Sequence, residues 1–331
     1  MKLIIQIPCY NEEKTIPETL HDIPKQIPGI DEVKILLIDD GSSDETVRVG
    51  LENGADYVVR HPANQGLAKA FITGIQTSLA LGADVIVNTD ADNQYPGKYI
   101  PELIQPIIEK KADISIGDRQ VAHNQYFPPL KQVLEVLGTW VMRKISRTDV
   151  QDAASGFRAY SRYAALRLKV YSSYSYTLET LIQAGNERMR IAHFSIITNA
   201  ATRESRLHKG ILHFIWRQAE TIIRSYVLYQ PLSTFTMISL PFLLSFVILI
   251  SRFFYYYFTE QSGIGRHVQS VSIGGTLGVL GLILLMLGLL GDAIRANRQI
   301  SDEILISQRA RFTMSETDRE IMGYPFISKS K

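Results

Sequence analysis

The chain has 331 residues, enough for one large domain or for one domain with an appendage, and its formal net charge of +2 gives no indication of nucleic-acid binding. Its single cysteine, Cys9, excludes internal disulfides and metal sites built on several thiolates. The mean hydropathy of +0.01 averages two unlike parts, because residues 1 to about 230 have an ordinary soluble composition whereas residues 232–290 are strongly apolar.

The first residues, MKLIIQIPCYNEE, do not have the pattern of a signal peptide. Their apolar run is short, lacks a small-residue cleavage site and soon meets Pro8 and two glutamates. We therefore expect the first domain to stay in the cytosol.

Short β-branched runs alternate with helical patterns through the first 118 residues. We expect strands at KLIIQI, VKILLID, DYVVR, DVIVNTD and DISIG, and helices in EEKTIPETLHDI, near 44–53, over 66–81 and around 98–110. This alternation predicts an α/β fold with a parallel sheet covered on both faces. Ligands bind beyond the carboxyl ends of strands in such sheets. Because PCYNEE, DDGSSDET, DADNQ and GDR all follow expected strands, they predict a site at one edge of the sheet.

The stretch NTDADNQ places Asp90 and Asp92 on either side of Ala91, directly after a buried strand. In an extended segment both carboxylates point the same way, and they repel each other unless a cation neutralises them. Carboxylate and amide oxygens are the ligands that Mg²⁺ and Mn²⁺ prefer, so Asp90, Asp92 and Gln94 form a candidate metal site. A surface turn or a helix N-cap is the alternative, and it explains one aspartate rather than two.

In DDGSSDET, Ser42 and Glu45 have the spacing of a helix capping box. That cap leaves Asp39 and Asp40 unexplained, and a carboxylate at a strand end is well placed to bond a ribose hydroxyl or a base edge. Neither GxGxxG nor GxxxxGK[ST] occurs, which disfavours the usual dinucleotide fold and the P-loop.

In GDRQ, Arg119 follows the next expected strand. Its guanidinium can bind a pyrophosphate in a bidentate manner, or it can pair with Asp118.

Residues 211–231 precede the apolar part and have an amphipathic pattern, which fits either a helix packed on its own domain or one lying in a membrane interface. Segments 232–258 and 271–291 are each long and apolar enough to cross a membrane, and the aromatic residues of 253–258 resemble an interfacial belt. A buried hairpin in a large soluble core is the alternative.

Basic residues flank the pair of segments more than they occupy the linker, so the positive-inside rule places both ends in the cytoplasm, with residues 292–331 as a cytosolic tail. Gly274 and Gly278 form a small-xxx-small pair that permits close helix approach and is compatible with a homo-oligomer.

Seven motifs occur in the order and rough spacing of one family: IPCYNEE, LLIDDGSSDET, NQGLAKA, NTDADNQYP, GDR, DAASGFRAYSR and TRESRL. Together, over residues 3–230, they resemble glycosyltransferase family 2, in particular the polyprenyl-phosphate glycosyltransferases similar to dolichyl-phosphate mannose synthase. The paired spans resemble the bacterial subgroup similar to the prophage bactoprenol glucosyl transferases. The resemblance implies a GT-A fold (Rossmann-like, nucleotide-diphospho-sugar transferase) over 1–210 and an integral protein of the bacterial inner membrane.

The resemblance also implies roles for individual residues. Mg²⁺ or Mn²⁺ on Asp90, Asp92 and Gln94 would bridge the donor's diphosphate. The implied donor-binding residues are Pro8, Tyr10, Glu12, Asp40, Asp90, Ala91, Asp92 and Arg119; the implied catalytic residues are Asp92, Asp152 and Arg119; and the acceptor phosphate would meet Arg158, Arg203 and Arg206. The family's ESKL appears here as ESRL, and Ala200 stands where such enzymes often carry an arginine.

The implied reaction is inverting transfer of a sugar from a UDP- or GDP-linked donor to a polyprenyl phosphate at the cytoplasmic face of the membrane. The lipid phosphate is already anionic, so alignment matters more than a strong base. Two alternatives stay open: a processive polysaccharide synthase of the same family, disfavoured by the lack of a Q-x-x-R-W motif, and a non-catalytic scaffold that binds a sugar nucleotide.

Overall fold

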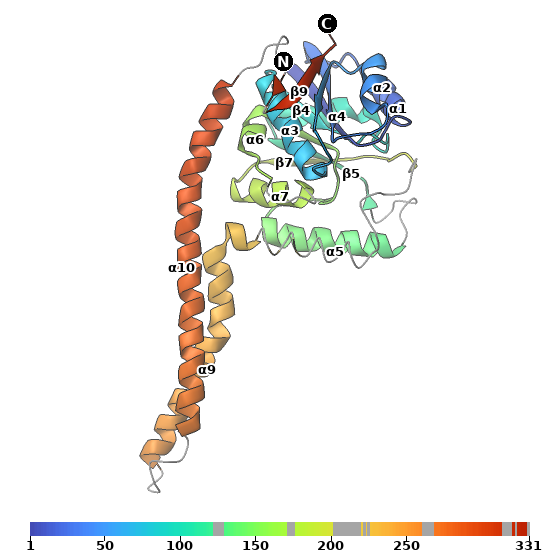
Figure 1. Cartoon of the computed structure of the whole chain (residues 1–331). Coiled ribbons are helices and arrows are strands. Elements are labelled where there is room, and N and C mark those ends of the chain that lie inside the picture. Colours follow the sequence, from blue (N-terminus) through green and yellow to red (C-terminus); the bar gives the residue numbers. More distant parts are fainter. Residues whose placement is uncertain are drawn as a thin grey trace. The chain divides into compact units, whose positions relative to one another are not determined.

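The structure, a computed structural model, describes residues 1–121, 129–170, 176–200, 220, 223, 226–259, 268–312, 320–321 and 323–329. The chain divides into two units, Met1–Ile222 with Leu305–Lys331, and Ile223–Ile304. Figure 1 shows the elements of both units.

The described strands of the first unit form one sheet in the order β7-β5-β6-β4-β1-β2-β3-β9-β8. Their bounds are β1 Lys2–Cys9, β2 Glu32–Asp39, β3 Tyr57–Arg60, β4 Val85–Asn88, β5 Ile114–Asp118, β6 Arg158–Ser161, β7 Ile191–Ser195, β8 Glu320–Ile321 and β9 Tyr324–Ser328. The five strands expected from the sequence are all present. β1 to β4 run parallel, whereas β6 lies antiparallel between β4 and β5, and β9 is antiparallel to β3. The expected parallel sheet is thus confirmed for its centre and corrected at these two strands.

Helices cover both faces of the sheet because residues along β1 alternate between them. Leu3, Ile5 and Ile7 point into one core, which α1 (Ile16–Asp22) and α4 (Ile100–Ile108) complete, with α2 (Thr46–Glu52) packed against it. On the other face lie α3 (Leu67–Ala80), α6 (Arg162–Arg167) and α7 (Tyr176–Asn186), and α5 (Pro129–Ser146) packs against α7. The loops at the carboxyl edge are therefore held by a rigid two-sided core.

The predicted capping box at the start of α2 is wrong. The helix begins at Thr46, and its N-cap Glu45 makes no side-chain cap hydrogen bond. Glu45 instead pairs with Arg48, and the Ser42 hydroxyl accepts a hydrogen bond from the backbone of Asn11. Ser42 is thus used to join two loops rather than to begin a helix.

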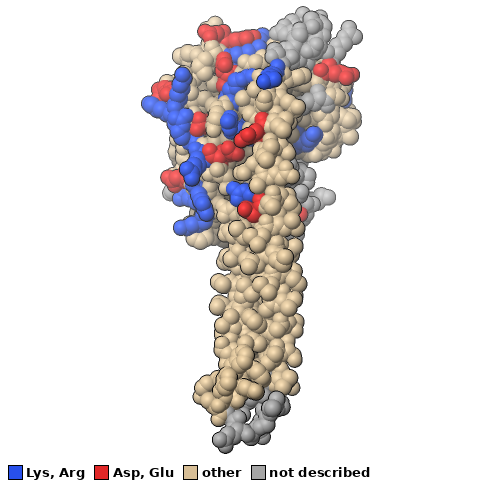
Figure 2. Space-filling model, turned by 90° about the vertical axis from the view of Figure 1, so that its left-hand side faces the viewer, with Lys and Arg blue, Asp and Glu red and all other residues tan. Residues whose placement is uncertain are grey.

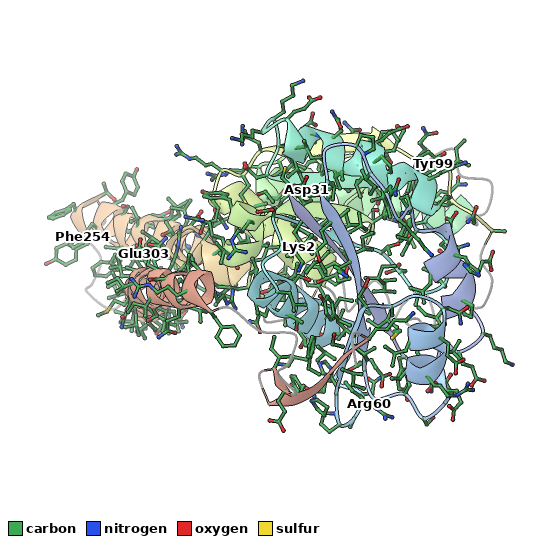
Figure 3. All side chains as sticks on the ribbon, turned by 90° about the horizontal axis from the view of Figure 1, so that it is seen from above. Lys2, Asp31, Arg60, Tyr99, Phe254 and Glu303 are labelled. Atoms are coloured by element: carbon green, nitrogen blue, oxygen red, sulfur yellow. The ribbon has the colours of Figure 1, made fainter. Side chains whose placement is uncertain are left out.

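The second unit contains α9 (Pro231–Thr259) and most of α10 (Val268–Arg311), both long and apolar enough to cross a membrane. On the face drawn in Figure 2 these helices carry no charged side chain over most of their length, and Phe254 points away from its helix in Figure 3. The expected span 232–258 agrees with α9 to within one residue at each end, whereas α10 continues well beyond 291. The expected amphipathic helix 211–231 lies largely outside the described residues.

Glycines of α10 pack directly against α9. A Cβ at Gly274 would lie 3.2 Å from Leu249 Cβ, one at Gly278 would lie 2.8 Å from Phe246, and one at Gly281 would lie 2.7 Å from Leu243. The small-xxx-small pair thus serves packing between two helices of one chain, and explaining it requires no second copy.

Residues 292–331, expected as a cytosolic tail, contain regular structure that joins the sheet, and their cytosolic location stays a prediction. α10 runs to Arg311, and β8 and β9 form a hairpin whose second strand pairs with β3 in the register Val58↔Ile327 and Val59↔Phe326. Phe326 is buried and stacks on Tyr57 with ring centroids 5.6 Å apart. The end of the described chain therefore belongs to the same sheet as its beginning.

Candidate active site at the carboxyl edge of the sheet

The loops after β1 and β2 are joined by hydrogen bonds. The backbone N–H of Asn11 donates to Ser42 Oγ at 2.8 Å, the N–H of Ser43 donates to Asn11 Oδ1 at 2.9 Å, and the N–H of Glu12 donates to Thr46 Oγ1 at 2.8 Å. Asn11 has φ +54°, a left-handed conformation that asparagine tolerates well. The first two polar clusters of the sequence therefore form one surface.

The predicted donor residues of the first loop differ in exposure. Tyr10 is 38% exposed, whereas Pro8 is buried at the end of β1. Glu12 is also buried, and its carboxylate accepts a hydrogen bond from Thr15 Oγ1 at 2.8 Å. Of these three side chains Tyr10 is the best placed to meet a ligand.

Asp40, expected to touch the base, organises a neighbouring loop. Its carboxylate accepts hydrogen bonds from the backbone N–H groups of Gln65 at 2.9 Å and Gly66 at 2.8 Å, and it lies 2.7 Å from His61 Nδ1. Asp40 thus fixes residues 61–66, the segment between β3 and α3. A contact with the base stays a prediction.

The stretch that holds Asp90 and Asp92 is a turn rather than an extended segment, because β4 ends at Asn88. Asn93 has φ +55°, and Asp92 Oδ1 accepts a hydrogen bond from the backbone of Gln94 at 3.2 Å. Exposure nevertheless alternates along the turn, with Asp90, Asp92 and Gln94 partly exposed and Ala91, Asn93 and Tyr95 buried. The three predicted ligands are thus the more accessible residues of this turn, and their binding of a cation stays a prediction.

These three side chains fit a hard divalent cation by their chemistry. They offer two carboxylates and one amide oxygen, all partly open to solvent, which leaves room for substrate oxygens and water in the coordination shell. Within the described part of the chain no group of three or more His, Cys, Asp or Glu side chains is arranged to hold a metal, and cation binding by Asp90, Asp92 and Gln94 stays a prediction.

Arg119 lies between two carboxylates. It donates from Nε to Asp152 Oδ2 at 2.7 Å and from Nη2 to Asp152 Oδ1 and Glu135 Oε2, both at 2.9 Å. Burial alone would raise the pKa of Asp152, but the charge and hydrogen bonds of Arg119 outweigh it and leave that pKa lowered. The alternative partner considered for Arg119, Asp118, instead accepts from the backbone of Gln120.

A buried polar network lies close to Asp90. Asn88 Nδ2 donates to the carbonyl of Gly156 at 3.0 Å and to Tyr176 Oη at 2.9 Å, and Gln6 Nε2 donates to Asn88 Oδ1 at 2.8 Å. A Cβ at Gly156 would lie 3.4 Å from the Asp90 carboxylate. Burial, and then the charge of Asp90, raise the pKa of Tyr176, which shows that this carboxylate acts on the network.

Arg158 does not fit its predicted role as a ligand of the acceptor phosphate. It is only 1% exposed, and its guanidinium donates to the carbonyls of Ala153, Ser155 and Thr177 and to Thr180 Oγ1. These bonds make Arg158 a structural centre that joins the 153–158 segment to α7. The other predicted acceptor ligands, Arg203 and Arg206, lie outside the described residues.

Helix α5 contributes two features that the sequence reasoning missed. Glu135 faces inward and reaches Arg119, while Val133, Val136, Leu137 and Trp140 form an exposed apolar face with the spacing i, i+3, i+4, i+7. The signal was a lone acidic residue in the apolar run VLEVLGTWVM. The helix that carries Glu135 into the site thus presents an apolar surface outward.

The sequence of residues 4–201 matches the family model described as Glycosyl transferase family 2. The chain belongs to glycosyl transferase family 2. This match spans more than half of the chain and includes the turn with Asp90 and Asp92, Arg119 and Asp152. The protein is a glycosyltransferase, and the resemblance to the polyprenyl-phosphate branch is confirmed by its relatives.

Among these relatives, the chain is 30% identical over 216 residues to a UDP-N-acetylglucosamine–dolichyl-phosphate N-acetylglucosaminyltransferase of Methanococcus voltae, covering 58% of this chain and 83% of the relative. It is 29% identical over 167 residues to an undecaprenyl-phosphate mannosyltransferase of Micrococcus luteus, covering 48% of this chain and 66% of the relative. These proteins transfer sugars in reactions that involve polyprenyl phosphates.

The fold is similar to that of solved glycosyltransferases. Glucosyl-3-phosphoglycerate synthase from Mycobacterium tuberculosis, in complex with Mn²⁺, UDP and glucosyl-3-phosphoglycerate, matches with a TM-score of 0.51 and 20% identity over 69% of this chain and 79% of that one. The expected GT-A-like domain, followed by two apolar helices, is thereby confirmed.

Proposed function

We propose that this protein transfers a sugar from a UDP- or GDP-linked donor to a polyprenyl phosphate at the cytoplasmic face of a membrane. The observation that carries the proposal is the placement of the Asp90–Gln94 turn and the Arg119–Asp152–Glu135 cluster at the same edge of the sheet, where β4 and β5, each antiparallel to β6, both end. The chain is also a family member with two apolar helices. The lipid acceptor is supported by the names of two relatives, a dolichyl-phosphate N-acetylglucosaminyltransferase and an undecaprenyl-phosphate mannosyltransferase.

The reaction is a single displacement. A phosphate oxygen of the lipid attacks the anomeric carbon, a new carbon–oxygen bond forms, and the bond to the nucleotide diphosphate breaks with its electrons on that leaving group. The attacking phosphate is already anionic, so no proton has to be removed first. Attack from the face opposite the leaving group inverts the anomeric centre.

The residues at the sheet edge divide the remaining work. A divalent cation on Asp90, Asp92 and Gln94 would supply positive charge to the donor's diphosphate as it departs. Asp152 is held ionised by Arg119, which suits it to orient groups rather than to donate a proton. Arg119 is kept in place by Asp152 and Glu135, and its contact with a phosphate is part of the proposal.

A lipid acceptor requires access from a membrane. The apolar face of α5 (Val133, Val136, Leu137 and Trp140) has the composition of a helix that lies in a membrane interface, with Arg143 and Lys144 in its last turn. Because Glu135 of the same helix reaches Arg119, such a location would bring the site close to the lipid headgroups. Arg203 and Arg206 are retained as proposed ligands of the acceptor phosphate.

Asp92→Asn in the full chain, purified in detergent, tests the proposal. Undecaprenyl phosphate and a panel of UDP- and GDP-sugars are supplied with Mg²⁺ or Mn²⁺, and formation of the sugar–lipid is measured. The neutral amide binds a divalent cation poorly, so we expect turnover to fall by about 100-fold or more. Glu102→Gln, an exposed position on α4, is the matched control and should retain activity.

Other outcomes would contradict the proposal in distinct ways. Unchanged turnover in Asp92→Asn would remove the metal-site assignment. Nucleotide binding by the wild type without any transfer would favour the non-catalytic scaffold, and products with many sugar units would favour the processive synthase.

A further inference from the structure

Strand β9 begins at the carboxyl edge of the sheet. Its first residue lies beside residues 61–66, which are hydrogen-bonded to Asp40. In the antiparallel register Val59 pairs with Phe326, so two residues further along Tyr324 comes level with His61, just beyond the end of β3. Gly323 precedes it in the hairpin turn with φ +78°. Arg60, labelled in Figure 3, marks this end of β3. Tyr324 thus lies at the same edge of the sheet as the candidate site.

Tyr324 interacts with two residues of the 61–66 segment and lies near one residue of α3. Its ring lies 4.5 Å from the ring of His61, centroid to centroid, its hydroxyl donates to Gln65 Oε1 at 3.2 Å, and Lys69 Nζ lies 5.9 Å from the ring centroid. These contacts differ from those of Phe326, whose stacking on Tyr57 anchors the hairpin in the core. Phe326 docks the hairpin, and Tyr324 reaches from it to the loop.

The 61–66 loop that Tyr324 contacts has few buried side chains. Residues 62–65 are exposed, and the loop is held from below by Asp40 through His61 Nδ1 and the backbone of Gln65 and Gly66. The loop in turn lies on the DDGSS turn, because a Cβ at Gly41 would come within 2.6 Å of the Ala63 carbonyl carbon. Movement of the loop would therefore change the shape of the surface that follows β2.

We propose that Tyr324 is a positioning residue of the nucleotide-sugar site, which holds the 61–66 loop, and through it Asp40 and the turn after β2, in the conformation that receives the nucleoside. The inference rests on the proposed function. Its physical basis is preorganisation: a loop that is already ordered loses less conformational entropy when a ligand binds. The segment after the apolar helices thereby takes part in donor binding rather than only in folding.

The test compares full-length variants in detergent. Dissociation constants for UDP and GDP with Mn²⁺ are measured by calorimetry, and KM values for the sugar nucleotide and for undecaprenyl phosphate are measured separately. For Tyr324→Ala we expect a rise of about tenfold in the Kd of the nucleotide that the wild type binds and in the KM of its sugar nucleotide, because one ring contact and one hydrogen bond are lost. The KM of the lipid should change less than about twofold. Ile327→Ala, on an exposed side chain of the same strand, is the matched control and should leave all of these values unchanged.

Two milder variants separate positioning from stability. Tyr324→Phe keeps the ring and removes the hydroxyl, and Gln65→Ala removes its acceptor, so each should raise the nucleotide Kd by about two- to threefold, and the double variant by no more than either alone. If Tyr324→Ala lowers the melting temperature of the protein, the nucleotide Kd values of Tyr324→Phe and Gln65→Ala decide whether Tyr324 has the positioning role.

The possible failures are distinguishable. If the wild type binds neither UDP nor GDP and transfers no sugar, the proposed function fails. If the wild type binds one of them and the folded Tyr324 variants bind it equally well, or if the lipid KM rises as much as the nucleotide KM, the positioning role alone is overturned.

Discussion

At the scale of single residues, the charges around Arg119 determine how the site responds to pH. Two carboxylates, Asp152 and Glu135, meet one guanidinium in a place that is nearly closed to water. The lowered pKa of Asp152 means that its interaction with Arg119 persists at neutral pH and well into the acid range. Asp152 and Arg119 therefore remain an ion pair over this pH range.

Asp152→Asn should cost stability in a manner that depends on pH. Removing one partner of a buried pair costs about 3 kcal/mol, and the remaining partner Glu135 places the effect near the low end of the usual range. Because the folded-state pKa of Asp152 is lowered, its contribution is fully present above its unfolded pKa of about 3.9 and is lost as the pH falls through the folded value.

Melting temperatures of both proteins between pH 7 and pH 3 give the measurement. The gap between wild type and variant should be widest at neutral pH and should narrow below about pH 4. Asp118→Asn, whose carboxylate accepts from the backbone of Gln120, is the control. If the difference in melting temperature between wild type and Asp152→Asn does not change with pH, the loss of stability comes from altered packing rather than from the lost charge.

At the scale of elements, the glycines of α10 determine how closely α9 can approach. Gly274, Gly281 and Gly288 recur every seven residues, the period of a left-handed helix pair, and each faces a side chain of α9. Gly275 lies beside this stripe and has nothing within 4 Å of its Cβ position. Comparing a glycine that faces α9 with Gly275 therefore separates the effect of helix packing on stability from the effect of helix propensity.

Alanine at Gly281 and at Gly275 should change stability in opposite directions. Gly281→Ala forces its Cβ to 2.7 Å from Leu243, which we expect to cost about 1–3 kcal/mol. Gly275→Ala meets no neighbour and should gain up to about 1 kcal/mol from its higher helix propensity. Thermal unfolding in detergent measures both, and a shift of the same sign and size would contradict the observed packing.

Local sequence pattern predicts some strands of the sheet but not those that depend on partners far away in the sequence. β1 to β5 are continuous apolar runs bounded by polar clusters, so composition alone located them. β6 is only four residues long, RAYS, and contains the buried Arg158, whose charge is satisfied by carbonyls that only the folded chain brings near. β9 pairs with a strand more than 260 residues away, and no local pattern specifies such a partner.

The same division applies to the candidate site. The prediction of Asp90, Asp92 and Gln94 as candidate ligands needed only side-chain types and spacing within five consecutive residues. The partner of Arg119 could not be predicted in this way, since Asp152 and Glu135 come from separate segments, and the nearest carboxylate in sequence, Asp118, is engaged elsewhere. Likewise the supporting network of Gln6, Asn88 and Tyr176 draws on three elements that meet only in the folded domain.

At the scale of the whole molecule, the two units differ in what surrounds their side chains. The first unit buries its apolar residues between sheet and helices, whereas α9 and α10 leave large apolar side chains such as Met237 and Phe258 exposed, each at 77%. Exposed apolar surface of this extent is costly in water and is typical of helices surrounded by lipid. α9 and α10 thus have the composition of helices that could cross a membrane, whereas the described residues of the proposed site lie in the first unit.

The pairing of β9 with β3 has a consequence for topology. A chain that leaves a sheet and later returns to it must cross any intervening membrane an even number of times, so parity excludes a single crossing. Tags before Met1 and after Lys331 should therefore become accessible to protease together, in sealed vesicles of one orientation and not the other. If one tag were digested while the other was protected, the two ends would lie on opposite sides of the membrane, which would contradict the pairing of β9 with β3. The pairing of β9 with β3 is therefore compatible with two crossings by α9 and α10 or with none, but not with one.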